Sequence, residues 1–222
     1  MEYINKKLEE FNKFLDSKKV AIIGMGVSNL PLLDYFYDKN AKVTVFDKNT
    51  PSDEIMEKIN KYRYEVEIGE YNLSRLNGFD IVFRSPSVLP TREELVTAAN
   101  KGAIITSEIE MVLKLAPCKI IGVTEIKNMK PEDIVVLELS SFQLMGMKVS
   151  PDISVVTNMY PDHLNIHSSY EEYQQAKKNI FLHQNENGVV ILNYDNEITR
   201  KFADEVKSKL VFFSSLEKLE NG

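Results

Sequence analysis

Hydrophobic residues in the first half of the chain occur in short runs that are separated by amphipathic stretches. The runs have the length and the Val, Ile and Phe content of buried strands. They are KVAIIG (19–24), AKVTVFD (41–47), YEVEIG (64–69) and FDIVFRS (79–85). Residues 29–40 have apolar positions at helical spacing, and residues 91–102 read as a helix with a Thr91 cap and a closing Gly102. This alternation predicts a parallel, doubly wound α/β sheet.

The same pattern starts again in the second half of the chain. The strand-like runs are KIIGVT (119–124), DIVVLELS (133–140), DISVVTN (152–158), GVVILN (188–193) and KLVFF (209–213). A helix that reaches Ala116 meets Pro117, which cannot continue it. We therefore predict two domains, 1–116 and 117–222, each of the α/β class.

One connection in the second half is too short for the predicted fold. Only eight residues, EIKNMKPE, separate the runs 119–124 and 133–140. Neighbouring parallel strands need a crossover of about a dozen or more residues, which is usually a helix. Either these two strands pair antiparallel or a segment is missing. The last run also lacks a closing element, so we expect an incomplete polypeptide.

Composition and charge narrow the classes of function. The 222 residues include 27 Lys and Arg against 33 Asp and Glu, a net charge of -6, so we expect no nucleic-acid partner. No apolar run approaches the roughly 18–20 residues that span a bilayer, and the start MEYINKKLEE lacks the apolar stretch of a signal peptide. We expect a cytoplasmic monomer without membrane insertion. A single cysteine, Cys118, excludes an internal disulfide and reads as a small buried hydrophobe.

The first candidate site is the segment GMGVSN, Gly24 to Asn29, between the first strand and the following helix. Amide N–H groups at such a turn, together with the helix dipole, attract a diphosphate. Asp47 ends the next strand, where nucleotide-binding sheets place an acceptor for the ribose or the base. Asn29 occupies the position of the third glycine in the dinucleotide fingerprint. The alternative is that the glycines serve only a tight turn.

The second candidate is Glu138, the one acid in the apolar segment VLELSSFQL. A carboxylate at the end of a buried parallel strand is costly unless it is paired or bound to a cation. Glu138 is therefore a candidate metal ligand. The alternative is an acid that is satisfied by nearby donors such as Ser140 or Ser141.

The third candidate region follows the strand 152–158, because open α/β sheets bind ligands where strands end. His163 lies just after that strand, and Lys177 lies in a helix that starts near Ser169. His163 and His167 are four residues apart, a spacing that could hold a metal on a helix. The residues between them lack the glutamate of zinc hydrolases, which argues against a zinc site.

Together these motifs resemble the Mur ligases in order and context. The segments that carry the resemblance are GMGVSN with Asp47, FRSPSV (83–88), ITSEIEMV (105–112), VLELSSFQL (136–144), NMYPDHLNIH (158–167) and YQQAKKNIF (173–181). VLELSSFQL is the most specific and resembles the members that add D-glutamate. The resemblance implies an N-terminal Rossmann-like domain followed by a partial central α/β domain of the ATPase type.

The resemblance also implies a reaction, its cofactors and its residues. The reaction is the ATP-dependent addition of D-glutamate to UDP-N-acetylmuramoyl-L-alanine in bacterial peptidoglycan precursor synthesis, with Mg²⁺ to neutralise the phosphates. The implied UDP site comprises Gly26, Val27, Ser28 and Asn29 at the diphosphate, Asp47 and Lys48 at the uracil, and Ser85. The implied catalytic and metal-binding residues are Glu138, His163 and a carbamylated Lys177, and Asn193 and Asp195 would contact adenine.

One departure from the family limits what the chain is expected to do. In Mur ligases GVT continues into the phosphate loop GTNGKT, whereas Thr124 is here followed by EIKNMK. The lysine and threonine that would hold ATP and magnesium are absent, so we expect UDP binding without ligation. The alternatives are a non-catalytic UDP-binding module and a nicotinamide-dependent oxidoreductase. Asn29 in place of the third glycine disfavours the oxidoreductase.

Overall fold

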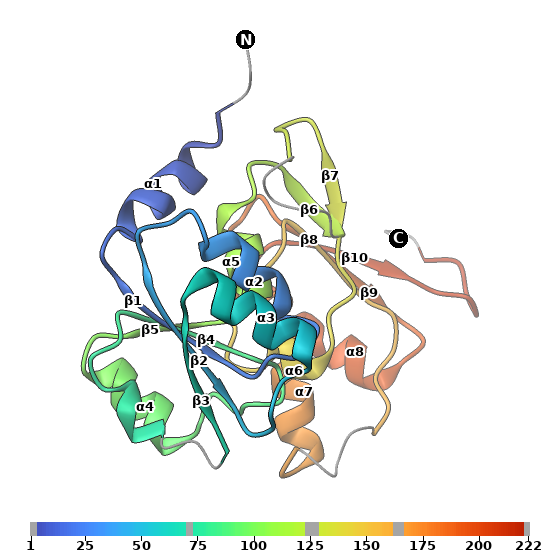
Figure 1. Cartoon of the computed structure of the whole chain (residues 1–222). Coiled ribbons are helices and arrows are strands. Elements are labelled where there is room, and N and C mark those ends of the chain that lie inside the picture. The colour runs from blue at the N-terminus through green and yellow to red at the C-terminus, as the bar shows by residue number, and fades with distance from the viewer. Residues whose placement is uncertain (1–3, 70–72, 123–128, 162–166, 220–222) are drawn as a thin grey trace. The chain divides into compact units, whose positions relative to one another are not determined.

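The chain divides into two units, Met1–Val112 and Leu113–Gly222. The structure is a computed structural model that describes residues 4–69, 73–122, 129–161 and 167–219 (Figure 1). We call the two parts the N-terminal unit and the C-terminal unit. The domain border expected after Ala116 lies close to this division. None of the helices in the described ranges has the length and apolar character needed to cross a membrane.

The N-terminal unit alternates strands and helices, as the sequence predicted. Its elements are α1 (Lys6–Phe14), β1 (Lys19–Ile23), α2 (Leu30–Phe36), β2 (Lys42–Asp47), α3 (Asp53–Tyr62), β3 (Glu65–Ile68), the 3₁₀ helix η1 (Leu73–Leu76), β4 (Ile81–Arg84), α4 (Glu93–Asn100), β5 (Ile104–Thr106) and α5 (Glu108–Leu115), which extends past the division. The four predicted strands are present. The sequence analysis did not identify α1, α3 or β5.

All five strands of the N-terminal sheet are parallel, in the order β3-β2-β1-β4-β5. The predicted parallel, doubly wound fold is thereby confirmed. The chain builds the sheet outward from β1 through β2 to β3, and then returns to the other side of β1 with β4. The strand order therefore reverses between β1 and β4. In open α/β sheets such a reversal opens a crevice beyond the carboxyl ends of the two strands, where ligands bind.

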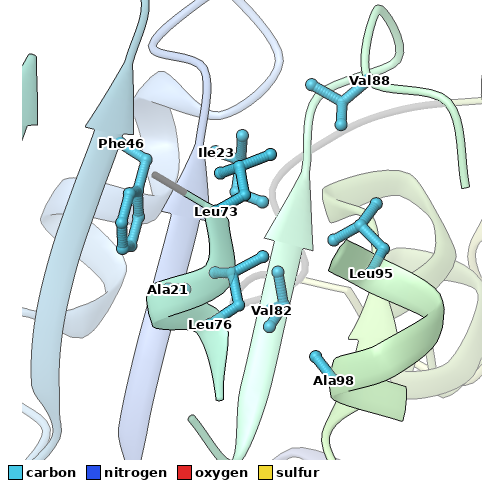
Figure 2. Close-up of a cluster of buried hydrophobic side chains, with 9 residues drawn as sticks. All are labelled: Ala21, Ile23, Phe46, Leu73, Leu76, Val82, Val88, Leu95 and Ala98. Carbon is cyan, nitrogen blue, oxygen red and sulfur yellow. The ribbon is translucent and has the colours of Figure 1, made fainter. Parts of the chain in front are cut away.

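Continuous apolar strands fit a sheet that is covered on both faces. On one face, side chains of β1, β2 and β4 pack against η1 and α4 (Figure 2). This cluster consists of Ala21, Ile23, Phe46, Leu73, Leu76, Val82, Val88, Leu95 and Ala98. On the opposite face, Phe83 meets Phe36 of α2 edge to face, with ring centroids 5.5 Å apart. The two layers fix the strand ends that carry the candidate site.

The helix expected over 91–102 is shorter at its start than predicted. α4 begins at Glu93 with Arg92 as its N-cap, and no side chain caps it, so the Thr91 cap is wrong. The acidic first turn, Glu93 and Glu94, supplies the negative charge that a helix N-terminus favours. The predicted end is correct: Gly102 follows the C-cap with a φ of 98°.

The C-terminal unit is also α/β. Its elements are β6 (Lys119–Gly122), β7 (Ile134–Val136), α6 (Ser141–Leu144), β8 (Ile153–Val156), α7 (Tyr170–Lys178), β9 (Val189–Asn193), α8 (Glu197–Phe202), the 3₁₀ helix η3 (Ala203–Glu205) and β10 (Lys209–Phe213). The strands form a parallel sheet in the order β10-β9-β8 and a separate pair, β6 and β7. Cys118 is half-buried, which corrects the expectation of a fully buried cysteine.

The pair β6 and β7 resolves the question raised by the short connection. The two strands are parallel, so the antiparallel alternative is wrong. Residues 123–133 connect them, fewer than the dozen or so of an ordinary crossover, and their described part, 129–133, contains no helix. Ile134 and Val136 on β7 are 66% and 64% exposed. Among the described residues no element covers the apolar side chains of Ile134 and Val136, whereas parallel sheets are normally covered on both faces.

Candidate functional site

The glycine turn and Ser85 lie at the strand reversal of the N-terminal sheet. β1 and β4 are neighbours, with Ile23 opposite Arg84. Gly24 follows β1 and Ser85 follows β4, and the Ser85 N–H donates to the Ile23 carbonyl at 2.9 Å. The structure thus brings together two segments that the sequence separates by some 60 residues, at the edge where ligands of such sheets bind.

Gly24 is required by the geometry of this turn. Its φ is 84°, a conformation that side chains with a Cβ rarely adopt. A Cβ on Gly24 would lie 2.8 Å from Ser85 Oγ and 3.1 Å from Ser85 Cβ. The Gly24 N–H donates to the Phe46 carbonyl at 2.7 Å. The glycine therefore allows three neighbouring strand ends to approach closely.

Asp47 anchors the turn from the end of β2. Its Oδ2 accepts a hydrogen bond from the Met25 N–H at 2.6 Å, and its Oδ1 accepts one from the Asn49 N–H at 2.9 Å. Lys48, next to it, is exposed. The carboxylate that the sequence marked as a nucleotide acceptor thus already has two backbone donors, and it positions the turn as well as facing the same edge of the sheet.

Asn29 braces the turn from inside. Its side chain is fully buried, and Nδ2 donates to the carbonyls of Ile23 at 3.0 Å and Gly24 at 2.9 Å. Its backbone N–H donates to the Gly26 carbonyl at 3.1 Å. Its Oδ1 is buried and has no hydrogen-bond partner among the residues that the structure describes. Because its donors are engaged within the turn, Asn29 would act on a diphosphate through the shape of the turn.

Three consecutive amides of the turn remain open. In the described part of the chain no acceptor lies within hydrogen-bond reach of the N–H groups of Gly26, Val27 or Ser28. Val27 is 91% exposed, and a Cβ on Gly26 would meet nothing within 4 Å. Successive free N–H groups at a turn form a concave site for an anion, and the absence of a side chain at Gly26 leaves room for it. The geometry therefore suits a phosphate or diphosphate.

Next to Ser85 lies a group of buried polar residues that the sequence analysis missed. Its members are Arg84, Thr106, Ser107 and Glu110, each at most 7% exposed. Arg84 Nη1 donates to the Val88 carbonyl at 3.1 Å. Burial lowers the pKa of Arg84, and the negative charge of Glu110 opposes that shift. The signal was available in FDIVFRS, where one arginine ends an apolar run.

A cavity of about 510 Å³ in the N-terminal unit lies at the opposite end of the strands from the glycine turn. Residues at the amino-terminal ends of the strands line it, among them Lys19, Lys42 and Glu65. It contains none of the residues of the glycine turn. The cavity is therefore separate from the candidate diphosphate site.

In the C-terminal unit, Glu138 differs from its predicted setting. β7 ends at Val136, so Glu138 follows the strand, and its side chain is exposed. The expected cost of burying this acid therefore does not arise, and the burial argument for a metal ligand is wrong. After Glu138 the chain enters α6, which Ser140 caps in a capping box with Gln143.

Lys177 lies beside the segment of Glu138. Its Nζ donates to the Leu139 carbonyl at 3.2 Å. His167, which is 2% exposed, shares a hydrogen bond of 2.9 Å with Ser141 and stacks on Phe142. The structure therefore brings the segment after β7 and helix α7 together, and the catalytic role of these residues stays a prediction.

The magnesium prediction depends partly on His163, which lies outside the described residues. Within those residues no three His, Cys, Asp or Glu side chains cluster as a metal site would require. The donors that can be placed are the exposed carboxylate of Glu138 and, after carbamylation, an added carboxylate on Lys177. Carboxylate oxygens are ligands that Mg²⁺ prefers, so the chemistry of this partial set fits magnesium.

The predicted adenine-contacting residues hold the end of β9. Asn193 Nδ2 donates to the Thr157 carbonyl at 2.9 Å, and its Oδ1 accepts from the Asp195 N–H at 2.8 Å. The Asp195 carboxylate accepts hydrogen bonds from Ser214 Oγ at 2.5 Å and the Ser215 N–H at 2.7 Å, which lower its pKa. Both side chains thus have structural partners, and their contact with adenine stays a prediction.

Comparison with known proteins identifies both halves of the chain. Residues 18–107 match the N-terminal domain of Mur ligases of the MurD-like type, and residues 105–221 match the Mur ligase middle domain. The fold resembles that of UDP-N-acetylmuramate:L-alanyl-gamma-D-glutamyl-meso-diaminopimelate ligase from Neisseria meningitides. The TM-score is 0.54 at 14% identity, over 93% of this chain and 82% of that protein.

Two sequence relatives are UDP-N-acetylmuramoylalanine–D-glutamate ligases. That of Clostridium acetobutylicum is 41% identical over 99% of this chain and 56% of its own length, and that of Ruminiclostridium cellulolyticum is 39% identical over 99% and 55%. The chain thus spans about half the length of these relatives. The first alignment has 257 positions, 35 more than the 222 residues of the chain. Because 99% of the chain is aligned, the extra positions lie inside the matched region. The two domain matches, supported by these relatives, show that the chain belongs to the Mur ligase family.

Proposed function

We propose that the N-terminal unit binds the UDP part of UDP-N-acetylmuramoyl-L-alanine, at the turn formed by Gly26, Val27 and Ser28. The observation that carries this proposal is the row of three open N–H groups at the strand reversal, held by Asp47. Ser85 forms a wall of the same site. In this proposal Lys48 lies on the uracil side, next to Asp47.

We propose further that the whole protein is an ATP-dependent ligase that joins D-glutamate to this substrate in peptidoglycan precursor synthesis. The names of the relatives support this assignment. Glu138, His163 and Lys177 would hold magnesium, which neutralises the charge that builds up when a phosphoryl group is transferred from ATP to a carboxylate. Asn193 and Asp195 would lie at the adenine. Because the substrates are soluble nucleotides and amino acids, we assign the reaction to the cytoplasm, with a monomer as the working state.

The chain of 222 residues has only part of this machinery. The short parallel connection between β6 and β7, the exposed Ile134 and Val136, and the 35 extra aligned positions all support a missing crossover in the C-terminal unit. The family carries its phosphate loop after the strand that corresponds to β6. We therefore propose that this chain is a non-catalytic UDP-binding form of the ligase.

Two measurements on the same preparation test the proposal. Isothermal titration calorimetry should show binding of UDP, and binding of NAD at least tenfold weaker; equal or tighter binding of NAD would contradict the UDP assignment. Phosphate release with ATP, Mg²⁺, UDP-N-acetylmuramoyl-L-alanine and D-glutamate should stay at background. The C. acetobutylicum relative serves as the positive control. Phosphate release by this chain at the rate of that control would refute the proposal that the chain is non-catalytic because a crossover is missing.

A further inference from the structure

Arg84 and Glu110 are charged residues that nothing in the proposed function uses, yet both are buried, at 4% and 7% exposure. A buried guanidinium or carboxylate is costly unless it has a counter-charge and hydrogen-bond partners. The charge of Glu110 acts on Arg84 in the direction that stabilises the guanidinium. Such a pair is weak support for stability by itself, because apolar residues could replace it at little cost. Stability is therefore a weak explanation of this pair, and its position at the end of β4 indicates another role.

Arg84 is the last residue of β4, directly before Ser85. Its guanidinium donates to the Val88 carbonyl at 3.1 Å, while the Val88 N–H donates to the Ser85 carbonyl at 3.0 Å. Residues 85–88 thus form a turn that is closed by one backbone hydrogen bond and held from the buried side by Arg84. A lysine has no planar guanidinium and could not reproduce the direction of this hydrogen bond.

The turn 85–88 forms the wall against which the glycine turn packs. Ser85 is bonded to the end of β1 through its N–H, and its Oγ occupies the space next to Gly24. Ser85 Oγ also lies 2.9 Å from Ser87 Oγ. A shift of the turn would move this wall, and with it the open N–H groups of Gly26 to Ser28.

Glu110 is itself held in place. Its Oε2 accepts a hydrogen bond from Thr106 Oγ1 at 3.3 Å, and its N–H donates to Ser107 Oγ at 3.3 Å. Thr106 ends β5, which pairs with β4. The counter-charge of Arg84 is thus fixed by the neighbouring strand end.

We infer that Arg84, with Glu110 as its counter-ion, is a positioning residue for diphosphate binding, because it holds the turn 85–88 against the glycine turn. This inference rests on the proposed UDP function. It predicts that Arg84 matters for the diphosphate and little for the nucleoside. A pair that only stabilised the fold would leave the affinity of the folded protein unchanged for both ligands.

The test uses the full chain, with R84M, E110Q, the double variant R84M/E110Q and R84K. R92M is the matched control, because Arg92 is exposed and pairs with Glu94. Melting followed by circular dichroism reports folding, and calorimetric titrations with UDP and with uridine report binding. R84M leaves the charge of Glu110 buried without its counter-charge and should melt lowest, whereas the double variant removes both charges and should recover most of that loss.

The double variant should bind UDP about tenfold or more weakly than the unaltered chain, and uridine within about threefold. R92M should match the unaltered chain. If the double variant is unfolded, R84K decides, because it keeps the charge beside Glu110 but loses the planar fork. A folded double variant, or a folded R84K in its place, that binds UDP as the unaltered chain does would overturn the inference.

Failure of the proposed function would look different. In that case the unaltered chain itself would not bind UDP. Hydrogen exchange of the Val88 amide then still tests whether Arg84 holds the turn 85–88. This turn should lose its protection from exchange in the double variant and keep it in R92M. Unchanged Val88 protection in the folded double variant would refute the positioning role whatever the ligand.

Discussion

Replacing Gly24 with alanine should destabilise the N-terminal unit through two separable effects. The φ of 84° would place an alanine in the left-handed region, at a cost of about 1–2 kcal/mol. The new Cβ would also lie 2.8 Å from Ser85 Oγ and 3.1 Å from Ser85 Cβ, an overpacking that typically costs about 1–3 kcal/mol. We therefore expect a total loss of about 2–5 kcal/mol in the free energy of unfolding.

A second glycine provides a matched control for the backbone effect. Gly78 has a φ of 98°, but a Cβ there would meet nothing within 4 Å. G78A should therefore show only the loss of about 1–2 kcal/mol from the backbone. S85A should partly rescue G24A, because it removes the Oγ at 2.8 Å and leaves the Cβ at 3.1 Å.

Urea unfolding followed by circular dichroism, with hydrogen exchange of residues 19–47, measures these differences. A chain of two units can unfold in two steps, so urea unfolding alone does not say which unit has lost stability. The hydrogen-exchange data assign the loss of stability to the N-terminal unit. G24A should also weaken UDP binding, and G78A should not. If G24A and G78A lost equal stability and S85A gave no rescue, the close packing of the two turns would be refuted.

Three further predictions concern other contacts. D47A removes the acceptor of the Met25 and Asn49 N–H groups and should cost about 1.5–3 kcal/mol in urea unfolding and weaken UDP binding; unchanged affinity would contradict its anchoring role. The Lys19 N–H and the Lys18 ammonium lower the pKa of Asp80, so its contribution is present above the unfolded pKa near 3.8 and lost as the pH falls through the lower folded value. D80N should therefore reduce the loss of unfolding free energy as the pH falls into the acid range. An acid-range pH profile identical to that of the unaltered chain would argue against the lowered pKa of Asp80. S141A removes the 2.9 Å hydrogen bond to His167 and should lower the stability of the C-terminal unit by about 0.5–1.5 kcal/mol, whereas the exposed S215A should change it less than S141A does.

The parallel sheet was predictable because its central strands are buried on both faces and therefore read as apolar runs. Strand β5 was missed because only Ile104–Thr106 pair, and this stretch runs directly into the amphipathic pattern of α5. Helix α3 carries a Ser52 N-cap and an acidic first turn, which together form a start signal that is present in the sequence. The prediction of short elements from sequence thus depends on local start and end signals more than on hydrophobic periodicity.

The candidate site was predictable where backbone conformation demands a residue type and less so where side chains meet across strands. Gly24 and Asp47 stand out because the turn needs a glycine and a carboxylate acceptor. The burial expected for Glu138 was wrong because β7 already ends at Val136 and the acid that follows it is exposed. Arg84 and Glu110 were missed because their relation exists only once β4 and β5 lie side by side.

The central claim is that the open amides of the glycine turn bind the diphosphate of a UDP-linked substrate. The most direct test is a titration of the isotope-labelled chain with UDP, followed through its amide resonances in nuclear magnetic resonance spectra. We expect the largest shifts at Gly26, Val27, Ser28 and Ser85, smaller shifts with uridine, and unchanged resonances in β10. Saturable shifts that spare the turn and appear elsewhere, or no shifts at millimolar UDP, would contradict it.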